Sequence, residues 1–227
     1  FSWQTAANPT QSPAGPAGIT LKNVDIPIHT INSNAQATQN ETQKVLEVAY
    51  DFFLAKTSET SIVYSFSPTG IDLSQKNLLE VTLYQSAASN NEINFHLGGV
   101  NEDADGDGLL DTEDENKDNL LQPAEDIGFL YNPAGSDKGS RRYGGGDGRI
   151  NSEDLNQNGK LDSADFTGGD FGYLNSASQN LYDVTNQINR TKLDFTGWHT
   201  FQIPLNITQA EAPRWLAVKQ LRISIRQ

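Results

Sequence analysis

Two stretches decide the fold class, Leu79-Glu-Val-Thr-Leu83 and Ile93-Asn-Phe-His-Leu97. In both, apolar residues alternate with polar ones, which is the pattern of a β-strand with one buried face. The same alternation recurs outward along the chain, at 46–54, 62–66, 201–205 and 221–225. Clusters of Gly, Pro, Asn and Ser separate these stretches and predict turns. We therefore predict an all-β protein, an antiparallel two-sheet β-sandwich, with one short helix around 41–46.

The chain carries a strong acidic charge that is concentrated in one block. Its 227 residues include 29 acidic and 16 basic side chains, a formal net charge of −13. From Glu102 to Asp170 there are 18 acidic and 6 basic residues, a net of −12, which leaves 11 acidic and 10 basic residues elsewhere. This balance argues against binding to nucleic acid, because neutralising phosphates needs clustered Lys and Arg. No apolar run approaches the ~18 residues of a membrane span, so we predict no transmembrane segment.

The acidic block contains a match to the 12-residue calcium loop. That loop places side-chain oxygens at positions 1, 3, 5, 9 and 12, a backbone carbonyl at position 7 and glycine at position 6. Residues 103–114 fit all of these positions, with Gly108 at the sharp turn. The predicted ligands are Asp103, Asp105, Asp107, Asp111 and Asp114, together with the backbone carbonyl of Leu109.

A second loop, 114–125, begins where the first one ends. Asn119 replaces glycine at position 6, which is tolerable because asparagine enters the left-handed region more readily than most residues. Because Asp114 belongs to both loops, we expect two ions to lie close together. The predicted ligands are Asp114, Asn116, Asp118, Gln122 and Glu125, together with the backbone carbonyl of Leu120.

The pair of loops recurs about forty residues later in the chain. Residues 154–165 form a third match, with Gly159 at position 6. The segments 126–132 and 170–175, one after each pair, also resemble each other. We therefore predict an internal duplication of two loop pairs. The ligands predicted in the third loop are Asp154, Asn156, Asn158, Asp162, Asp165 and the backbone carbonyl of Lys160.

The loop that precedes the third one, 143–154, is only a half-loop. Tyr143 and Gly145 stand at its positions 1 and 3 and offer no carboxylate. The predicted ligands at its positions 5, 9 and 12 are Asp147, Asn151 and Asp154. This half-loop is either empty or completed from elsewhere, for instance by Asp137. We expect the whole block to bind two to four calcium ions.

Other metals and catalytic chemistry fit the block less well. Magnesium prefers rigid octahedral sites that keep several water molecules. Zinc would need Cys or His, but the chain has no Cys, and His29, His96 and His199 are not spaced as a motif. Carboxylates that hold calcium stay ionised and make poor general acids. The chain also has no serine elbow, P-loop or zinc-protease motif, so we predict that it is not an enzyme.

The overlapping loops resemble thrombospondin type 3 repeats, and the stretch 146–154 resembles the first loop of a dockerin. The flanks resemble the galactose-binding-like jelly-roll sandwiches that are common in bacterial carbohydrate-binding modules. The matching pieces are 70–83, 94–97, 194–205 and 215–225. The combination of a sandwich with Asp-rich loops is also similar to parts of large bacterial cell-surface proteins linked to gliding and secretion.

These resemblances imply a discontinuous jelly-roll sandwich, formed by 1–100 and 176–227, with a calcium-binding insertion at 101–175. They also imply a non-catalytic module at the cell surface or outside the cell that recognises carbohydrate. The alternative is a structural or adhesive segment, stiffened by calcium, whose partners are neighbouring domains of a large bacterial surface protein. Loops of this kind in exposed modules bind calcium at ~10⁻⁴–10⁻³ M, which predicts an extracellular location.

Aromatic side chains are the candidates for contact with a sugar, because an aromatic ring offers a flat apolar face on which a sugar ring can pack. The candidates are Trp3, Tyr131, Tyr143, Tyr173 and Trp198. Each has an alternative role in packing. Trp198 and Trp215 flank predicted strands and suit the core or a sheet edge, while Tyr131 and Tyr173 stand at equivalent places in the repeat and suit a cover over the ion loops.

Overall fold

The computed structural model describes residues 3–8, 18–36, 40–55, 58–131, 141–143, 146, 148–162, 192–205, 207–210 and 212–227. Their elements are β1 (Trp3–Ala6), β2 (Ile19–Pro27), α1 (Ile28–Ile31), β3 (Thr42–Tyr50), α2 (Phe52–Ala55), β4 (Glu59–Ser65), β5 (Leu78–Gln85), β6 (Glu92–Gly98), β7 (Phe129–Tyr131), β8 (Arg141–Tyr143), β9 (Gly197–Pro204), the 3₁₀ helix η1 (Ala212–Trp215) and β10 (Gln220–Arg226). Each helical element has four residues, so the predicted all-β class is confirmed. Within the described residues, no helix has the length and apolar character needed to cross a membrane.

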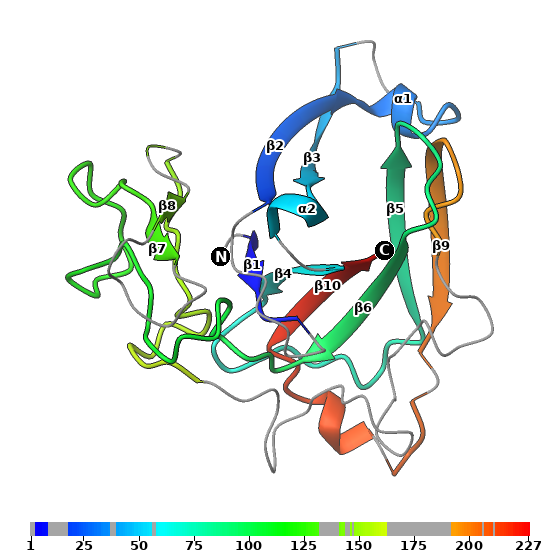
Figure 1. The fold of residues 1–227 in the computed structure, drawn as a ribbon. Helices are drawn as coiled ribbons and strands as arrows, with labels where there is room; N and C mark the ends of the chain where they lie inside the picture. Colours follow the sequence, from blue (N-terminus) through cyan, green and yellow to red (C-terminus); the bar gives the residue numbers. More distant parts are fainter. Residues whose placement is uncertain are drawn as a thin grey trace.

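The largest sheet has four antiparallel strands in the order β1-β4-β10-β6 (Figure 1). Strand β10 pairs with β4 on one side and with β6 on the other, so that Ile223 lies opposite Ile62 and Phe95. Three further sheets have two antiparallel strands each among the described residues: β5 with β9, β2 with β3, and the short β7 with β8. After β6 the chain runs through the acidic block. The next strand after the block is β9, which pairs with β5.

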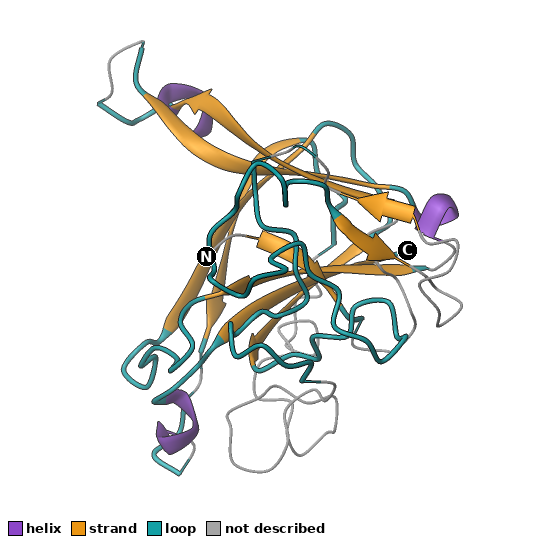
Figure 2. Ribbon diagram, turned by 90° about the vertical axis from the view of Figure 1, so that its left-hand side faces the viewer, coloured by secondary structure: helices purple, strands orange, loops and turns teal. Residues whose placement is uncertain are grey.

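The hydrophobic core lies between the four-stranded sheet and the β5–β9 pair. From β6 and β10 it receives Phe95 and Ile225, which are 1% and 7% exposed. Val81 of β5 and Phe201 of β9 pack against this cluster. Trp215 is fully buried in a second cluster, the packing role that its position next to a strand suggested. Layers that pack through such faces are compatible with the predicted β-sandwich, and Figure 2 shows the strands beside long stretches of loop.

Two predictions about the first half of the chain are wrong. The helix predicted around 41–46 is part of strand β3, which pairs along its whole length with β2. The strand predicted over 46–54 ends at Tyr50, and α2 follows, with the Asp51 carboxylate accepting the N–H of Phe53 at 2.9 Å in the manner of a helix cap. Pairing with a partner strand overrides a local preference. The alternation pattern also missed β1, whose partner β4 is distant in the chain, and β2, which pairs with the next strand, β3.

The face of the four-stranded sheet that turns away from the core is polar but buried. His96 of β6 and Arg222 and Ser224 of β10 are each at most 3% exposed. Arg222 donates to the backbone carbonyl of Ala7 at 3.2 Å. Burial lowers the pKa of His96 well below 6.5, and the charges of Arg222 and Arg226 lower it further. The imidazole is therefore held neutral in the folded protein.

The neutral His96 predicts a loss of stability in mild acid. The folded state keeps this ring unprotonated, whereas the unfolded chain takes up a proton below a pKa of 6.5. The stability that depends on the neutral ring should therefore be fully present above that pH. The free energy of unfolding should fall by about 1 kcal/mol between pH 6.5 and pH 5.5. Denaturant titrations at both pH values measure this fall, and His96→Gln should reduce it. The control is His29→Gln, an exposed histidine of α1, and the same fall in both variants would contradict the prediction.

Candidate metal centre

Three of the predicted loops share one hydrogen-bond pattern. In each, the carboxylate at position 1 accepts the backbone N–H groups of positions 5 and 6. The groups are Asp103 with Asp107 and Gly108, Asp114 with Asp118 and Asn119, and Asp154 with Asn158 and Gly159, at 2.8–3.2 Å. These bonds wrap each loop around its first carboxylate.

The side chains at positions 3 and 5 continue the pattern. The oxygen at position 3 accepts the N–H of position 5, and the oxygen at position 5 accepts the N–H of position 7. The acceptors are Asp105, Asn116 and Asn156 at position 3 and Asp107, Asp118 and Asn158 at position 5, at 2.8–3.1 Å. Because these oxygens accept N–H groups of their own loop, they lie on its inside.

The backbone is left-handed at positions 4 and 6 of all three loops. The φ angles are 79° and 78° at Gly106 and Gly108, 60° and 61° at Lys117 and Asn119, and 62° and 74° at Gln157 and Gly159. Positive φ is costly for most residues other than glycine and asparagine. This requirement explains the glycine at position 6 in two loops and Asn119 in the third. The sharp turn that the sequence pattern requires is therefore present in each loop.

The first loop gathers its carboxylates most closely. Oxygens of Asp105, Asp107 and Asp111 lie within 4.8 Å of one another. So do oxygens of Asp103, Asp105 and Glu153. Asp105 and Asp111 are only 1% and 7% exposed, and the Oδ2 atom of Asp107 is buried without a hydrogen-bond donor among the described residues. Buried carboxylates at such distances repel one another unless a cation compensates their charge.

The second and third loops hold their ligand positions together through side-chain amides. The bonds run from Asn116 to Gln122 (2.8 Å), from Gln122 to Asp118 (2.8 Å), and from Asn156 and Asn158 to Asp162 (2.6 and 3.0 Å). At position 12 of the second loop, Glu125 is 8% exposed and accepts the N–H of Gln122 at 3.2 Å. Two other predicted ligands, Asp147 and Asp165, lie outside the described residues.

The half-loop 143–154 turns like the complete loops and has a carboxylate from another segment beside it. Gly146 and Gly148, at positions 4 and 6, both have φ of 70°. The Asp126 carboxylate accepts the N–H of Gly148 at 3.2 and 3.3 Å, and the Asp126 carbonyl accepts the N–H of Gly146 at 3.0 Å. Asp126 thus makes the contact that the position-1 aspartate makes in the other loops. The sequence suggested Asp137 for this role, and that residue lies outside the described part of the chain.

Three glutamates that the loop pattern did not single out tie the loops together. Glu102, Glu113 and Glu153 each directly precede the first aspartate of a loop, and they are 1–2% exposed. Glu153 accepts the N–H groups of Ala104 (2.7 Å) and Asp111 (3.1 Å) in the first loop. A glutamate repeated before each of these aspartates was the sequence signal that could have identified them.

Glu102 makes the reciprocal contact, from the start of the first loop to the third. It accepts the N–H groups of Leu155 and Asn156, both at 3.1 Å. It also accepts the N–H of Asp162 at 2.9 Å, while its own N–H donates to the Asp162 carbonyl at 3.0 Å. The first and third loops are therefore held to each other in both directions.

Glu113 connects the half-loop to the start of the second loop. It accepts the N–H groups of Asn151 (2.9 Å) and Gly128 (2.6 Å). Beside it, Thr112 and Ser152 form an antiparallel bridge. The hydrogen bonds of these three glutamates therefore join the loops into one connected unit.

Two of these buried glutamates have raised pKa values. Burial raises the pKa of Glu153 to about 9, although the N–H groups of Asp111 and Ala104 lower it. Burial also raises the pKa of Glu102 to about 7, against the N–H groups of Asp162 and Asn156. Neighbouring aspartates add to the rise in both cases. A bound cation would reverse it, because a nearby positive charge favours the ionised carboxylate.

The loops also contact strands β1 and β2. The Arg149 guanidinium donates to the carbonyls of Trp3 and Leu21, the second at 3.4 Å. Leu155 of the third loop is 5% exposed and belongs to a small apolar cluster with Ala6 of β1. The predicted insertion is therefore anchored on the strands by one apolar contact and by hydrogen bonds to the backbone.

The structure describes the surroundings of two of the five aromatic candidates for sugar contact. Trp198 on β9 lies opposite Tyr84 on β5, with ring centroids 5.2 Å apart, and Tyr84 is 56% exposed. Trp3 packs beside Tyr64 of β4 at 5.4 Å. Outside the described part of the chain lie the side chains of Tyr131 and Tyr143 and all of Tyr173.

Comparison with known proteins does not place the chain in a family. No protein-family model matches it, and no curated protein matches it either. The family resemblances of the sequence therefore stay expectations, and the geometry of the loops is the basis for assigning a function.

Proposed function

We propose that the acidic block binds calcium ions and belongs to a non-catalytic module that works outside the cell. The hydrogen-bond pattern shared by three loops is the observation that carries this proposal. It holds carboxylate and amide oxygens on the inside of each turn, and calcium takes about six to eight oxygen ligands in such loops. The first loop adds a buried group of aspartates whose mutual repulsion a divalent cation would relieve.

Calcium fits this set of groups better than the other common divalent cations. The described loop positions offer oxygen ligands of uneven geometry, with amides in place of several carboxylates. Calcium accepts such variable coordination, whereas magnesium requires a near-ideal octahedron and zinc prefers nitrogen and sulfur. Ions bound in the loops would also offset a net charge of −12 in the block.

Calorimetric titration of the chelator-treated chain with calcium tests the proposal. We expect two to four ions to bind, with dissociation constants of ~10⁻⁴–10⁻³ M, and magnesium to bind more weakly. Binding of fewer than two calcium ions at millimolar concentration would refute it. Affinity in the sub-micromolar range at every site would remove the reason for an extracellular location.

Asp126 should complete the site of the half-loop. Replacing it by alanine removes the carboxylate that contacts Gly148, so we expect Asp126→Ala to bind one calcium ion fewer, or one ion at least tenfold more weakly. Calorimetry of the variant beside the parent chain measures this. Asp72→Ala is the matched control, because Asp72 accepts the N–H of Ser74 in an exposed turn outside the block. Unchanged stoichiometry and affinity in Asp126→Ala would show that the half-loop is empty.

The partner of the module is either a glycan or a neighbouring domain of the same protein. The pair formed by the exposed Tyr84 and the half-buried Trp198 on the β5–β9 face favours the first, because aromatic faces pack against sugar rings. The reciprocal bonds of Glu102 and Glu153 favour the second, because they couple the loops into a body that calcium would stiffen. Glycan binding that depends on calcium would support the first role. Calcium-dependent stiffening without glycan binding would support the second.

A further inference from the structure

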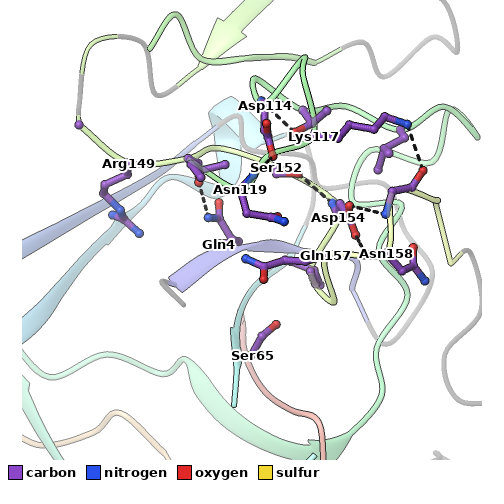
Figure 3. Close-up of a pocket in the computed structure, with 16 residues that line it drawn as sticks. Gln4, Ser65, Asp114, Lys117, Asn119, Arg149, Ser152, Asp154, Gln157 and Asn158 are labelled. Atoms are coloured by element: carbon purple, nitrogen blue, oxygen red, sulfur yellow. Dashed lines mark hydrogen bonds between the residues drawn. The ribbon is translucent and has the colours of Figure 1, made fainter. Parts of the chain in front are cut away.

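A cavity of about 470 Å³ lies between the loops and the strands. Its walls come from the end of the first loop, the second and third loops, the half-loop, β1 and β4, and Figure 3 shows their polar side chains arranged around it. This volume falls within the range of ~300–1,000 Å³ that is typical of small-molecule sites. Its wall includes the predicted ligands Asp114, Asp154 and Asn158, together with side chains to which the calcium loops assign no role.

The cavity wall carries the hydroxyl of a buried residue of the sheet. This is the side chain of Ser65, the last residue of β4, which is 6% exposed and lines the cavity. The amides of Asn119 and Gln157 also line it, from position 6 of the second loop and position 4 of the third. Neither position supplies a side-chain ligand in a calcium loop, so both amides remain available to another molecule.

The rest of the wall combines apolar groups with charges of both signs. Leu110, Ile150 and Leu155 form an aliphatic part of the lining, Lys117 and Arg149 add two positive charges, and Asp114 and Asp154 add two negative ones. These side-chain charges balance, so the lining itself favours neither a cation nor an anion. An anionic ligand is disfavoured by the surrounding block, which carries a net charge of −12 before any ion binds. The lining therefore suits a neutral molecule that has many hydrogen-bonding groups and an apolar face.

We propose that this cavity binds a neutral sugar. The hydroxyls of a pyranose both donate and accept hydrogen bonds, as do Ser65, Asn119 and Gln157, and its C–H face can pack on the leucine and isoleucine side chains. The proposal rests on the proposed function, because calcium-loaded loops hold two of the three polar groups in place. Sugar binding should therefore require calcium.

Calorimetry of the chain in millimolar calcium tests this, with methyl β-galactoside, methyl β-glucoside and methyl β-glucuronide as probes. We expect a neutral glycoside to bind, and the glucuronide, which differs from the glucoside by its carboxylate, to bind more weakly. Gln157→Gly and Asn119→Gly should each weaken sugar binding by about two- to tenfold, the effect of one hydrogen bond. Their calcium titrations should stay unchanged, because glycine accepts the φ of 62° and 61° at these positions.

Two further variants test whether the sugar occupies the cavity. Ser65→Ala should weaken sugar binding similarly without touching a loop, and Gln75→Gly, in an exposed turn that does not line the cavity, should not. If calcium binds but neither neutral glycoside does, the cavity proposal fails and the calcium proposal stands. If calcium does not bind, both fail. If a glycoside binds equally well to all the cavity variants, it binds elsewhere and the cavity proposal is overturned.

Discussion

Removing calcium should abolish amide-exchange protection in the loops while strands β4, β6 and β10 keep most of theirs. The two parts depend on different sources of stability. The strands bury Phe95 and Ile225 in an apolar core, whereas the loops bring together carboxylates that repel one another without a cation. At a hundredfold excess over the dissociation constant, each calcium site stabilises the folded state by ~2.7 kcal/mol. Two or three sites therefore approach the ~5–15 kcal/mol that holds a whole domain together.

Hydrogen exchange with and without EDTA measures this effect residue by residue. The control is EDTA followed by excess calcium, which should restore protection. We expect strand β1 to lose part of its protection with the loops, because Ala6 shares an apolar cluster with Leu155 and Gln4 donates to the Ile150 carbonyl at 2.5 Å. Equal loss of protection in β6, β10 and the loops would show that the protein is one cooperative unit.

The second large effect is expected for Glu153→Ala. This glutamate is 1% exposed and accepts the N–H groups of Ala104 and Asp111, so its removal leaves two buried donors without an acceptor. Each such donor costs about 1–3 kcal/mol, and the loss in the free energy of unfolding should therefore be about 2–6 kcal/mol in saturating calcium. The calcium binding proposed for the first loop should also weaken, because a Glu153 oxygen lies within 4.8 Å of oxygens of Asp103 and Asp105.

Denaturant titration and calcium calorimetry of the same variant measure both consequences. Glu115→Ala is the matched control, since Glu115 is an exposed glutamate of the same block and precedes no loop aspartate. Glu153→Gln keeps the shape and one acceptor oxygen, so it should fall between the parent chain and Glu153→Ala. If Glu153→Ala is no less stable than Glu115→Ala, the glutamate does not hold the loops together.

Much of the strand pattern was predictable because burial on one face of a sheet imposes a period of two on the sequence. Strands β5, β6 and β10 lie where the alternation places them. Strand β2 was missed and a helix was predicted within β3, because a two-stranded pair with half-exposed faces depends on its partner strand more than on its own pattern. Strand β1 was missed as well, since its four residues pair with β4, which is distant in the chain.

The turns of the loops follow from the sequence by itself, because a calcium loop folds around its own side chains within twelve residues. The spacing of Asp103, Asp105 and Asp107 was therefore sufficient to predict where the chain turns and which oxygens face inward. Contacts between loops are of another kind. Glu153 and Ala104 are 49 positions apart, and no spacing rule connects them. Only the tertiary structure decided that Glu153 supports the first loop and that Asp126 meets the half-loop, because those contacts depend on how separate turns pack in space.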